Sequence, residues 1–269
     1  MTFKQKIQNY FFPLGTVQKI KIGYLKGHKI RLTENSLWSP LLGKWEPAMQ
    51  KIMVNVIKEG QVAYDLGANN GLHGLLMAGL VGKTGLVYNF EPLNENIDEI
   101  DENFKLNQYS NYENVAAAIA DKEGTERFII TAHHKQGFIS NEQPAAEANT
   151  VEVKTTTLDN FIRGGNRGPS FMKIDIEGAE GAALRGFSST IGKYQPLMII
   201  ELHNPKQDME VGDFLKANKY SVFRFDPFAK LHFDEVKDFT KSAPHPDGIW
   251  GTVFCVPPGK QLSDFNFDK

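Results

Sequence analysis

The chain has 269 residues, of which 41% are hydrophobic and 23% are charged, a balance typical of a globular protein with a large core. Its 30 basic and 32 acidic residues give a net charge of −2, which provides no reason to expect general affinity for nucleic acid. The single cysteine, Cys255, excludes an intramolecular disulfide and a cysteine-rich zinc site, so we expect a reducing, cytoplasmic location. We expect no integral membrane segment, because no apolar run reaches the length needed, and no signal peptide.

The first sixty residues predict an annex made of a β-hairpin and a helix. Apolar and polar residues alternate over 19–24 and again over 29–32, on either side of a glycine turn, which is typical of a hairpin. Apolar residues at helical spacing then predict a helix from about residue 46 to residue 58. We therefore divide the chain into an annex at 1–60 and a second domain at 61–269.

From residue 61, short apolar segments typical of strands alternate with segments typical of helices. This alternation predicts an α/β fold with a Rossmann-like, doubly wound and mostly parallel sheet, because helices then cover both faces of the strands. The strands are expected at 62–66, 86–90, 115–119, 171–174 and 197–202, and the helices at 72–81, 94–107 and 178–187.

Two further regions do not follow the simple alternation. Alternating runs at 126–130 and 151–157 predict a β insertion, whose polar connection around Ala145 is expected to border the ligand. The segment 226–250 is rich in Pro, His and Phe and is expected to form a loop over the pocket. A helix and two strands that pair antiparallel at the sheet edge are expected at 211–218, 220–225 and 251–256.

The sharpest motif is Asp65-Leu66-Gly67-Ala68-Asn69-Asn70-Gly71, which follows a strand and opens a helix. Ligands of open α/β sheets bind at such strand ends, so we expect Asp65, Gly67, Asn69 and Gly71 to contact the cofactor. The glycine spacing differs from the G-x-G-x-x-G of dinucleotide-binding proteins, which argues against a nicotinamide-dependent oxidoreductase. Asp65 would repel a phosphate but suits a ligand with a positive end, such as S-adenosylmethionine.

The next two strand ends supply further candidate contacts. Glu91 lies 20 residues after Gly71, where an acidic side chain can accept both hydrogen bonds of a ribose diol. Ala118 lies at the end of the third strand and Asp121 follows it, and we expect Ala118 to flank an adenine ring with Asp121 at its amino edge. A simple turn beginning at Asp121 explains these two residues nearly as well.

Four polar residues follow the fourth and fifth strands. Asp175 and Glu177 end the fourth strand, and Glu201 and His203 end the fifth. Asp175 is also expected to contact the cofactor. Adjacent strands lie about 5 Å apart, so these side chains are expected to gather around one cavity. Glu180 falls in the first turn of the next helix, where a structural role is preferred.

The sequence leaves the role of the catalytic candidates Asp175, Glu201 and His203 open. In one mechanism His203 is a metal-free general base; in the other the three residues bind a divalent cation that lowers the pKa of the acceptor. The metal-free base is the preferred hypothesis, so no metal is expected. His203 as a simple cap of the turn at Asn204-Pro205 is the structural alternative.

Taken together, these motifs resemble the FkbM family of S-adenosylmethionine-dependent methyltransferases. The resemblance runs from about residue 61 to residue 225 and rests on five motifs in order, at 62–71, 88–92, 118–124, 153–159 and, most specifically, Met172-Lys173-Ile174-Asp175-Ile176-Glu177-Gly178. It implies a seven-stranded methyltransferase sheet, and O-methylation of a hydroxyl on a sugar, a glycolipid or a polyketide. The chain departs from the family at Leu72-His73-Gly74, where an aromatic residue and a serine are frequent.

We therefore expect an S-adenosylmethionine-dependent methyltransferase acting on a small-molecule or glycan acceptor. The alternatives are a nicotinamide-dependent oxidoreductase on the same class of fold and a non-catalytic adenosylmethionine-binding module, since fold alone does not decide activity. The oligomeric state stays open.

Overall fold

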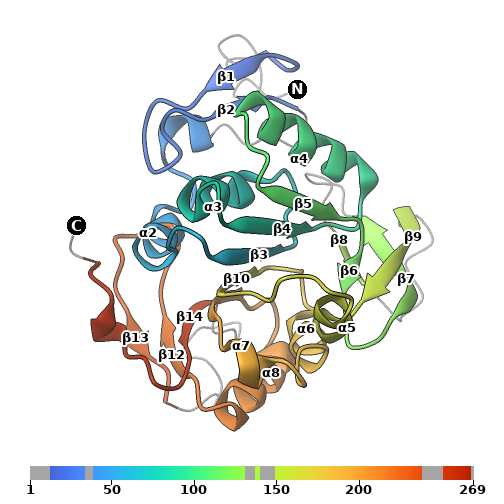
Figure 1. Ribbon diagram of the computed structural model, residues 1–269, viewed down its shortest axis with the longest axis vertical. Helices are drawn as coiled ribbons and strands as arrows, with labels where there is room; N and C mark the ends of the chain where they lie inside the picture. The colour runs from blue at the N-terminus through green and yellow to red at the C-terminus, as the bar shows by residue number, and fades with distance from the viewer. Residues whose placement is uncertain (1–12, 34–38, 131–136, 140–148, 238–250, 268–269) are drawn as a thin grey trace.

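A computed structural model describes residues 13–33, 39–130, 137–139, 149–237 and 251–267. Its centre is a twisted sheet of eight strands, in the order β13-β12-β14-β11-β10-β3-β4-β5 (Figure 1). The five strands from β11 to β5 are parallel, and β14 is antiparallel to both β11 and β12. The strands span β3 (Val62–Leu66), β4 (Leu86–Phe90), β5 (Tyr112–Val115), β10 (Phe171–Ile174), β11 (Leu197–Glu201), β12 (Ser221–Arg224), β13 (Asp234–Glu235) and β14 (Thr252–Val256).

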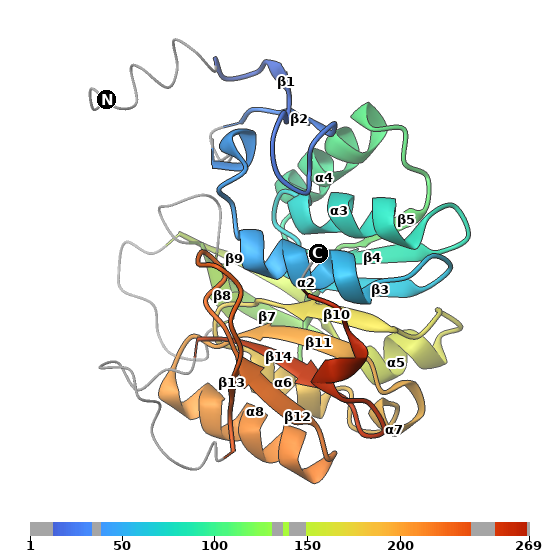
Figure 2. The same cartoon turned by 90° about the vertical axis from the view of Figure 1, so that its left-hand side faces the viewer.

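Helices cover both faces of this sheet, as the alternation of elements predicts. One face packs against α2 (Pro47–Val56), α3 (Leu72–Val81) and α4 (Asn94–Leu106); the other packs against α5 (Leu158–Arg163), α6 (Glu180–Arg185), α7 (Ile191–Tyr194) and α8 (Pro205–Ala217) (Figures 1 and 2). Strand residues alternate between the two cores: Ala63 belongs to the first and Tyr64 to the second. Burial on both faces explains why these strands are apolar throughout. The α/β class and the mostly parallel sheet are confirmed, with β13 as an eighth strand beyond the seven expected.

The expected third strand at 115–119 is wrong in its position. The sheet strand β5 ends at Val115, whose carbonyl accepts a hydrogen bond from the amide of Ala117 at 2.8 Å, and this tight turn leads the chain out of the sheet. Ala118 and Ile119 form β6, which pairs with Thr155 and Thr156 in a second sheet. That sheet has the order β6-β9-β7-β8 and contains β7 (Gly124–Ile130), β8 (Gly137–Ile139) and β9 (Asn149–Thr156), so the β insertion is confirmed.

The annex contains the expected hairpin and helix, and the second hairpin strand is confirmed as β2 (Lys29–Arg31). The first strand is β1 (Val17–Lys19), and residues 20–24 of the expected strand form a long turn instead. The turn arises because Ile20 and Leu25 are both buried, a spacing that a strand does not allow. A 3-10 turn (Ser39–Leu42) follows, and α2 packs in the same apolar core as α3.

The last elements complete the edge of the sheet. As expected, β12 and β14 pair antiparallel, and Cys255 lies fully buried on β14 between Met198 and Val222. Helix α8 begins at Pro205, six residues earlier than expected, because the Asn204 side chain accepts a hydrogen bond from the amide of Gln207 and Pro205 suits the first turn. Within the described ranges, no helix has the length and apolar character that crossing a membrane requires.

Candidate active site

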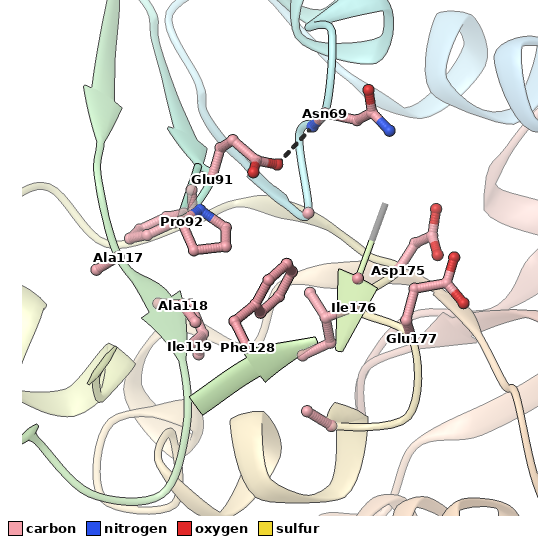
Figure 3. Close-up of a pocket in the computed structure, with 14 residues that line it drawn as sticks. Asn69, Glu91, Pro92, Ala117, Ala118, Ile119, Phe128, Asp175, Ile176 and Glu177 are labelled. Carbon is pink, nitrogen blue, oxygen red and sulfur yellow. Dashed lines mark hydrogen bonds between the residues drawn. The ribbon is translucent and has the colours of Figure 1, made fainter. Parts of the chain in front are cut away.

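A cavity opens at the carboxyl ends of the central strands, where ligands of open α/β sheets bind (Figure 3). The loop after β3, the end of β4, the second sheet and the loop after β10 all contribute to its wall. The lining residues are Gly67, Asn69, Phe90, Glu91, Pro92, Ala117, Ala118, Ile119, Phe128, Gly137, Asp175, Ile176, Glu177 and Ala179. The cavity therefore has an apolar half, near Phe128 and Ala118, and an acidic half, near Asp175 and Glu177.

The loop after β3 is packed against its neighbours on both sides. The amides of Gly67 and Ala68 donate to the carbonyl of Phe90, at 3.0 and 3.1 Å. Gly67 has a φ of 77°, and a Cβ at this position would lie 1.9 Å from the carbonyl oxygen of Asp175. The position therefore requires glycine, and it joins the end of β3 to the ends of β4 and β10.

Glu91 is 4% exposed and faces both this loop and the cavity (Figure 3). Its Oε2 accepts from the amide of Asn69 at 3.0 Å, and its Oε1 accepts from the amide of Leu93 at 3.0 Å and from Asn96 Nδ2 at 3.2 Å. Burial raises the pKa of Glu91 to about 7, although these three hydrogen bonds oppose the shift. The carboxylate is thus oriented in advance and poorly solvated, as suits a group that binds hydroxyls.

A buried lysine connects the ends of β3 and β10. Lys173 Nζ donates to the carbonyl of Gly67 at 3.0 Å and lies 3.1 Å from Asp175 Oδ2 and 3.5 Å from Asp65 Oδ1. Burial alone would lower the pKa of Lys173, but the charges of Asp175 and Asp65 outweigh it and raise the pKa. Burial alone would raise the pKa of Asp175, but Lys173 and His203 hold it below its ordinary value. Asp175 and Lys173 therefore form a buried ion pair.

His203 lies among three carboxylates. Its Nδ1 is 2.9 Å from Oε1 of the fully buried Glu180, and its Nε2 is 3.4 Å from Asp175 Oδ1 and 3.5 Å from Glu177 Oε2. Burial alone would lower the pKa of His203, but the hydrogen bond that its Nδ1 donates to Glu180 and the charge of Asp175 raise it to about 9. His203 is therefore an imidazolium at neutral pH, which does not fit the expected role as general base.

Glu201, like Glu91, is a carboxyl at this end of the sheet whose pKa is raised. Ile174 and Ile200 are register partners, so Asp175 and Glu201 leave the sheet from adjacent strands. Burial raises the pKa of Glu201 to about 7, and the charges of Asp175 and Glu46 add to the shift. A carboxyl with a pKa near 7 is suited to exchange protons at neutral pH.

The comparison with family models decides the relationship. The model described as the methyltransferase FkbM domain matches residues 65–226, more than half of the chain. The chain belongs to the FkbM methyltransferase family. This membership argues against the nicotinamide-dependent oxidoreductase. No curated protein matches the chain.

The solved structures that match this FkbM family member are similar to it in fold only. An FkbM methyltransferase from Methylobacillus flagellatus is 17% identical with a TM-score of 0.48, and the match covers 72% of this chain and 43% of the other. Fibrillarin from Aeropyrum pernix, in complex with S-adenosylmethionine, is 12% identical with a TM-score of 0.44 over 78% of this chain and 72% of its own. An S-adenosylmethionine-dependent O-methyltransferase from Thermotoga maritima is 11% identical with a TM-score of 0.41 over 79% and 65%. This chain thus spans less than half the length of the Methylobacillus protein.

The expected cofactor contacts of this FkbM methyltransferase separate into two groups. Gly67, Asn69, Glu91, Ala118 and Asp175 line the cavity. The other three are described but do not line it: Asp65 faces Lys173, Gly71 packs against Ile100 at the start of α3, and Asp121 is exposed and bound by Arg185 at 2.9 Å.

Arg185 of α6 holds the carboxylate of Asp121 at the surface, outside the residues that line the cavity. Of the expected reaction-end residues, the structure brings His203, Asp175 and Glu177 together. The turn at residue 204 is capped by Asn204 rather than by His203.

The departure from the family at His73 connects the annex to the site. His73 Nε2 lies 2.9 Å from Glu46 Oε2, and the His73 ring packs on Trp45 with centroids 4.1 Å apart. The negative charge of Glu46 in turn helps to raise the pKa of Lys173 and the pKa of Glu201. The annex therefore contributes an acidic side chain to the reaction end of the site.

The two expected walls of the acceptor site fall mainly outside the described residues. This is so for the connection around Ala145 and for residues 238–250, including Trp250. The described part of the second segment, 226–237, forms β13 at the sheet edge, and its Phe228 is 64% exposed. Sequence reasoning did not identify Lys173 or Phe128 as site residues; the available signals were one charged residue within an apolar strand and one aromatic residue in the β insertion.

Proposed function

We propose that this FkbM methyltransferase transfers the methyl group of S-adenosylmethionine to a hydroxyl of a sugar, a glycolipid or another small metabolite. The observation that supports the proposal is one cavity that joins Glu91 to the acidic group around Asp175. S-adenosylmethionine supplies a methyl group attached to a positively charged sulfur. The chain must hold that group and an acceptor oxygen in line, and orientation alone is worth roughly 7–11 kcal/mol.

The residues of the cavity fit this cofactor. Oε1 of Glu91 already accepts two hydrogen bonds, whereas Oε2 accepts one and keeps a lone pair, which suits a hydroxyl of the ribose. Ala118 and Phe128 offer apolar surfaces of the kind that an adenine ring requires. Asp175 and Glu177 give the other half a negative potential, which attracts a sulfonium and an ammonium group.

Removal of the acceptor proton falls to Glu201 in this proposal. His203 is held as a cation by Glu180 and Asp175, so it orients the carboxylates rather than accepting a proton. The pKa of Glu201 lies at about 7, so its carboxylate form is present at neutral pH and could accept the hydroxyl proton. The acceptor oxygen would then bond to the methyl carbon as the carbon–sulfur bond breaks and S-adenosylhomocysteine leaves. The proton then passes from Glu201 to water.

The cofactor assignment is tested by calorimetry with S-adenosylmethionine, S-adenosylhomocysteine and NADH. Glu91→Ala should weaken binding of the first two at least about tenfold, because each hydrogen bond to a charged group is worth about 1.5–3 kcal/mol. Glu113→Ala, which removes an exposed glutamate from the neighbouring strand, is the matched control and should leave binding unchanged. Binding of NADH without binding of S-adenosylmethionine would overturn the assignment.

The transfer itself is tested with methyl-labelled cofactor and a panel of glycan, glycolipid and small-molecule hydroxyl acceptors. On an acceptor that is methylated, Glu201→Gln should lower the rate by about 100-fold or more. Loss of activity in His203→Gln with a normal rate in Glu201→Gln would assign the base to His203 instead.

Chelation completes the mechanistic test. Ligand atoms of Asp175, Glu177 and His203 lie within 4.8 Å of one another, a set that also suits a divalent cation, with Glu177 where the sequence favoured Glu201. We expect EDTA to leave the rate unchanged. Loss of activity in EDTA, restored by Mg²⁺ or Mn²⁺, would replace the metal-free mechanism. Cofactor binding without transfer to any acceptor would favour the non-catalytic module.

A further inference from the structure

The charges of the chain are distributed unevenly. Residues 1–33 contain seven lysine and arginine residues and no acidic residue, although the whole chain has a net charge of −2. The remainder of the molecule is therefore clearly acidic. A basic segment attached to an acidic body indicates a partner with negative charge for that segment alone.

The described part of this segment, the hairpin region 14–29, also exposes apolar side chains. Its exposed fractions are 57% for Ile22, 46% for Leu14, 40% for Val17 and 38% for Tyr24. These four are among the seven large hydrophobic side chains that are exposed in the described residues. Exposed lysines alternate with them, at positions 19, 21, 26 and 29. None of these lysines forms an ion pair with a carboxylate in the part of the chain that the structure describes.

The hairpin is held in a defined shape by its inward-facing residues. Ile20 and Leu25 are buried in the core, and the amide of Gly27 donates to the carbonyl of Ile20 at 2.9 Å. His28 Nε2 lies 2.9 Å from the hydroxyl of Tyr109, which fixes the base of the turn to the sheet domain. Ile22 and Tyr24 thus point outward from an anchored turn, although apolar side chains of this size are ordinarily buried.

We propose that the hairpin region 14–29 is a docking surface for an anionic lipid bilayer. Each lysine near such a bilayer contributes on the order of 1 kcal/mol, and the apolar side chains gain from burial at the level of the headgroups. An RNA or DNA backbone would satisfy the lysines but would leave Ile22 and Val17 in water, so a bilayer fits the combination better. The proposal does not depend on methyl transfer, since it concerns a surface outside the cavity.

The position of the hairpin supports this orientation. It lies at one end of the molecule, and α8 lies at the opposite end in both views (Figures 1 and 2). Contact through the hairpin therefore directs α8, with Asp208 and Glu210, away from the bilayer. The acidic residues of α8 then do not oppose the attraction of the lysines, because charges beyond about 10 Å are largely screened at moderate salt. Helix α4 packs against β2, and its Glu102 forms an ion pair with Arg31 of the hairpin.

The test is co-sedimentation of the full chain with vesicles of phosphatidylcholine, with and without phosphatidylglycerol. We expect binding only to the vesicles that contain phosphatidylglycerol, and a loss of binding at high salt. The double variant Lys21→Glu/Ile22→Asp should bind roughly 30-fold more weakly or worse, since it reverses one charge and removes one inserting side chain. Lys216→Glu/Met209→Asp makes the same changes on exposed residues of α8 and should bind like the unmodified chain.

The outcomes separate the proposal from its alternatives. Equal binding of the hairpin variant and the unmodified chain would overturn it, as would absence of binding to anionic vesicles. Binding of single-stranded RNA that is lost in the hairpin variant, together with no vesicle binding, would make the hairpin a nucleic-acid surface. Thermal unfolding of both double variants checks that each is folded, and calorimetry with S-adenosylmethionine should show no change in either.

Discussion

Gly67 is the residue on which the geometry of the cofactor loop depends most directly. Two separate features require glycine here. The φ is 77°, and a Cβ at this position would lie 1.9 Å from the carbonyl oxygen of Asp175. Gly251 has nearly the same φ, 73°, but nothing lies within 4 Å of its Cβ position. The pair therefore separates backbone strain from steric exclusion.

We predict that Gly67→Ala abolishes cofactor binding and destabilises the fold more than Gly251→Ala does. Gly251→Ala should cost only the left-handed strain of roughly 1–2 kcal/mol and leave cofactor affinity intact. Chemical denaturation and calorimetry on both variants provide the measurement. Equal losses in the two variants would show that the contact with Asp175 is unimportant.

At the same scale, the sequence predicts the acidic residues of the site better than their partners. Glu91 and Asp175 follow apolar strands directly, so their place at the sheet edge can be inferred from position alone. Lys173 lies inside a strand, and only the three-dimensional register shows that it reaches Gly67 and Asp65. Asp121 shows the opposite case: it also follows a strand, but its carboxylate forms an ion pair with the exposed Arg185 of α6.

Among the elements, α8 depends on a cap at Asn204, a role that the sequence analysis considers only for His203 and only as an alternative. Asn204 Oδ1 accepts from the amide of Gln207 at 3.1 Å and satisfies one of the free donors at the helix start. We predict that Asn204→Ala lowers the free energy of unfolding by about 1 kcal/mol, whereas Asn204→Asp retains most of it. Urea denaturation is the measurement, and no change in the alanine variant would contradict the cap.

The central strands and helices could be predicted because each has a continuous apolar pattern and a clear boundary. Helix 72–81 and strands 62–66, 86–90 and 171–174 lie where the pattern places them. The third strand could not be predicted in this way. Val115 and Ile119 belong to one apolar segment of the sequence, but a turn at Ala117 places them in different sheets. The hairpin failed for a related reason: alternation over 19–24 suggests a strand, while burial of Ile20 and Leu25 requires a turn.

For the molecule as a whole, we predict that stability falls as pH rises from about 6.5 to 9. The pKa of His203 is raised to about 9, so its stabilising contribution is complete below the unfolded value of 6.5 and is lost as pH passes the folded value. A shift of this size corresponds to about 3 kcal/mol. Thermal unfolding across this range should show the fall in the unmodified chain and in His232→Gln, whose side chain is 82% exposed, but not in His203→Gln. A parallel fall in all three would assign the effect elsewhere.

The only cysteine of the chain, Cys255, lies inside the eight-stranded sheet, and its burial controls how fast its thiol can react. Cys255 is fully buried on β14, and burial raises its pKa, so it reacts with a thiol reagent only after the strand has opened. The labelling rate in native buffer therefore follows the rate and extent of opening, and it should be far below that in urea. A ligand that binds only the closed form reduces opening further. Slower labelling in S-adenosylmethionine would thus record cofactor binding on the unmodified protein, without any acceptor.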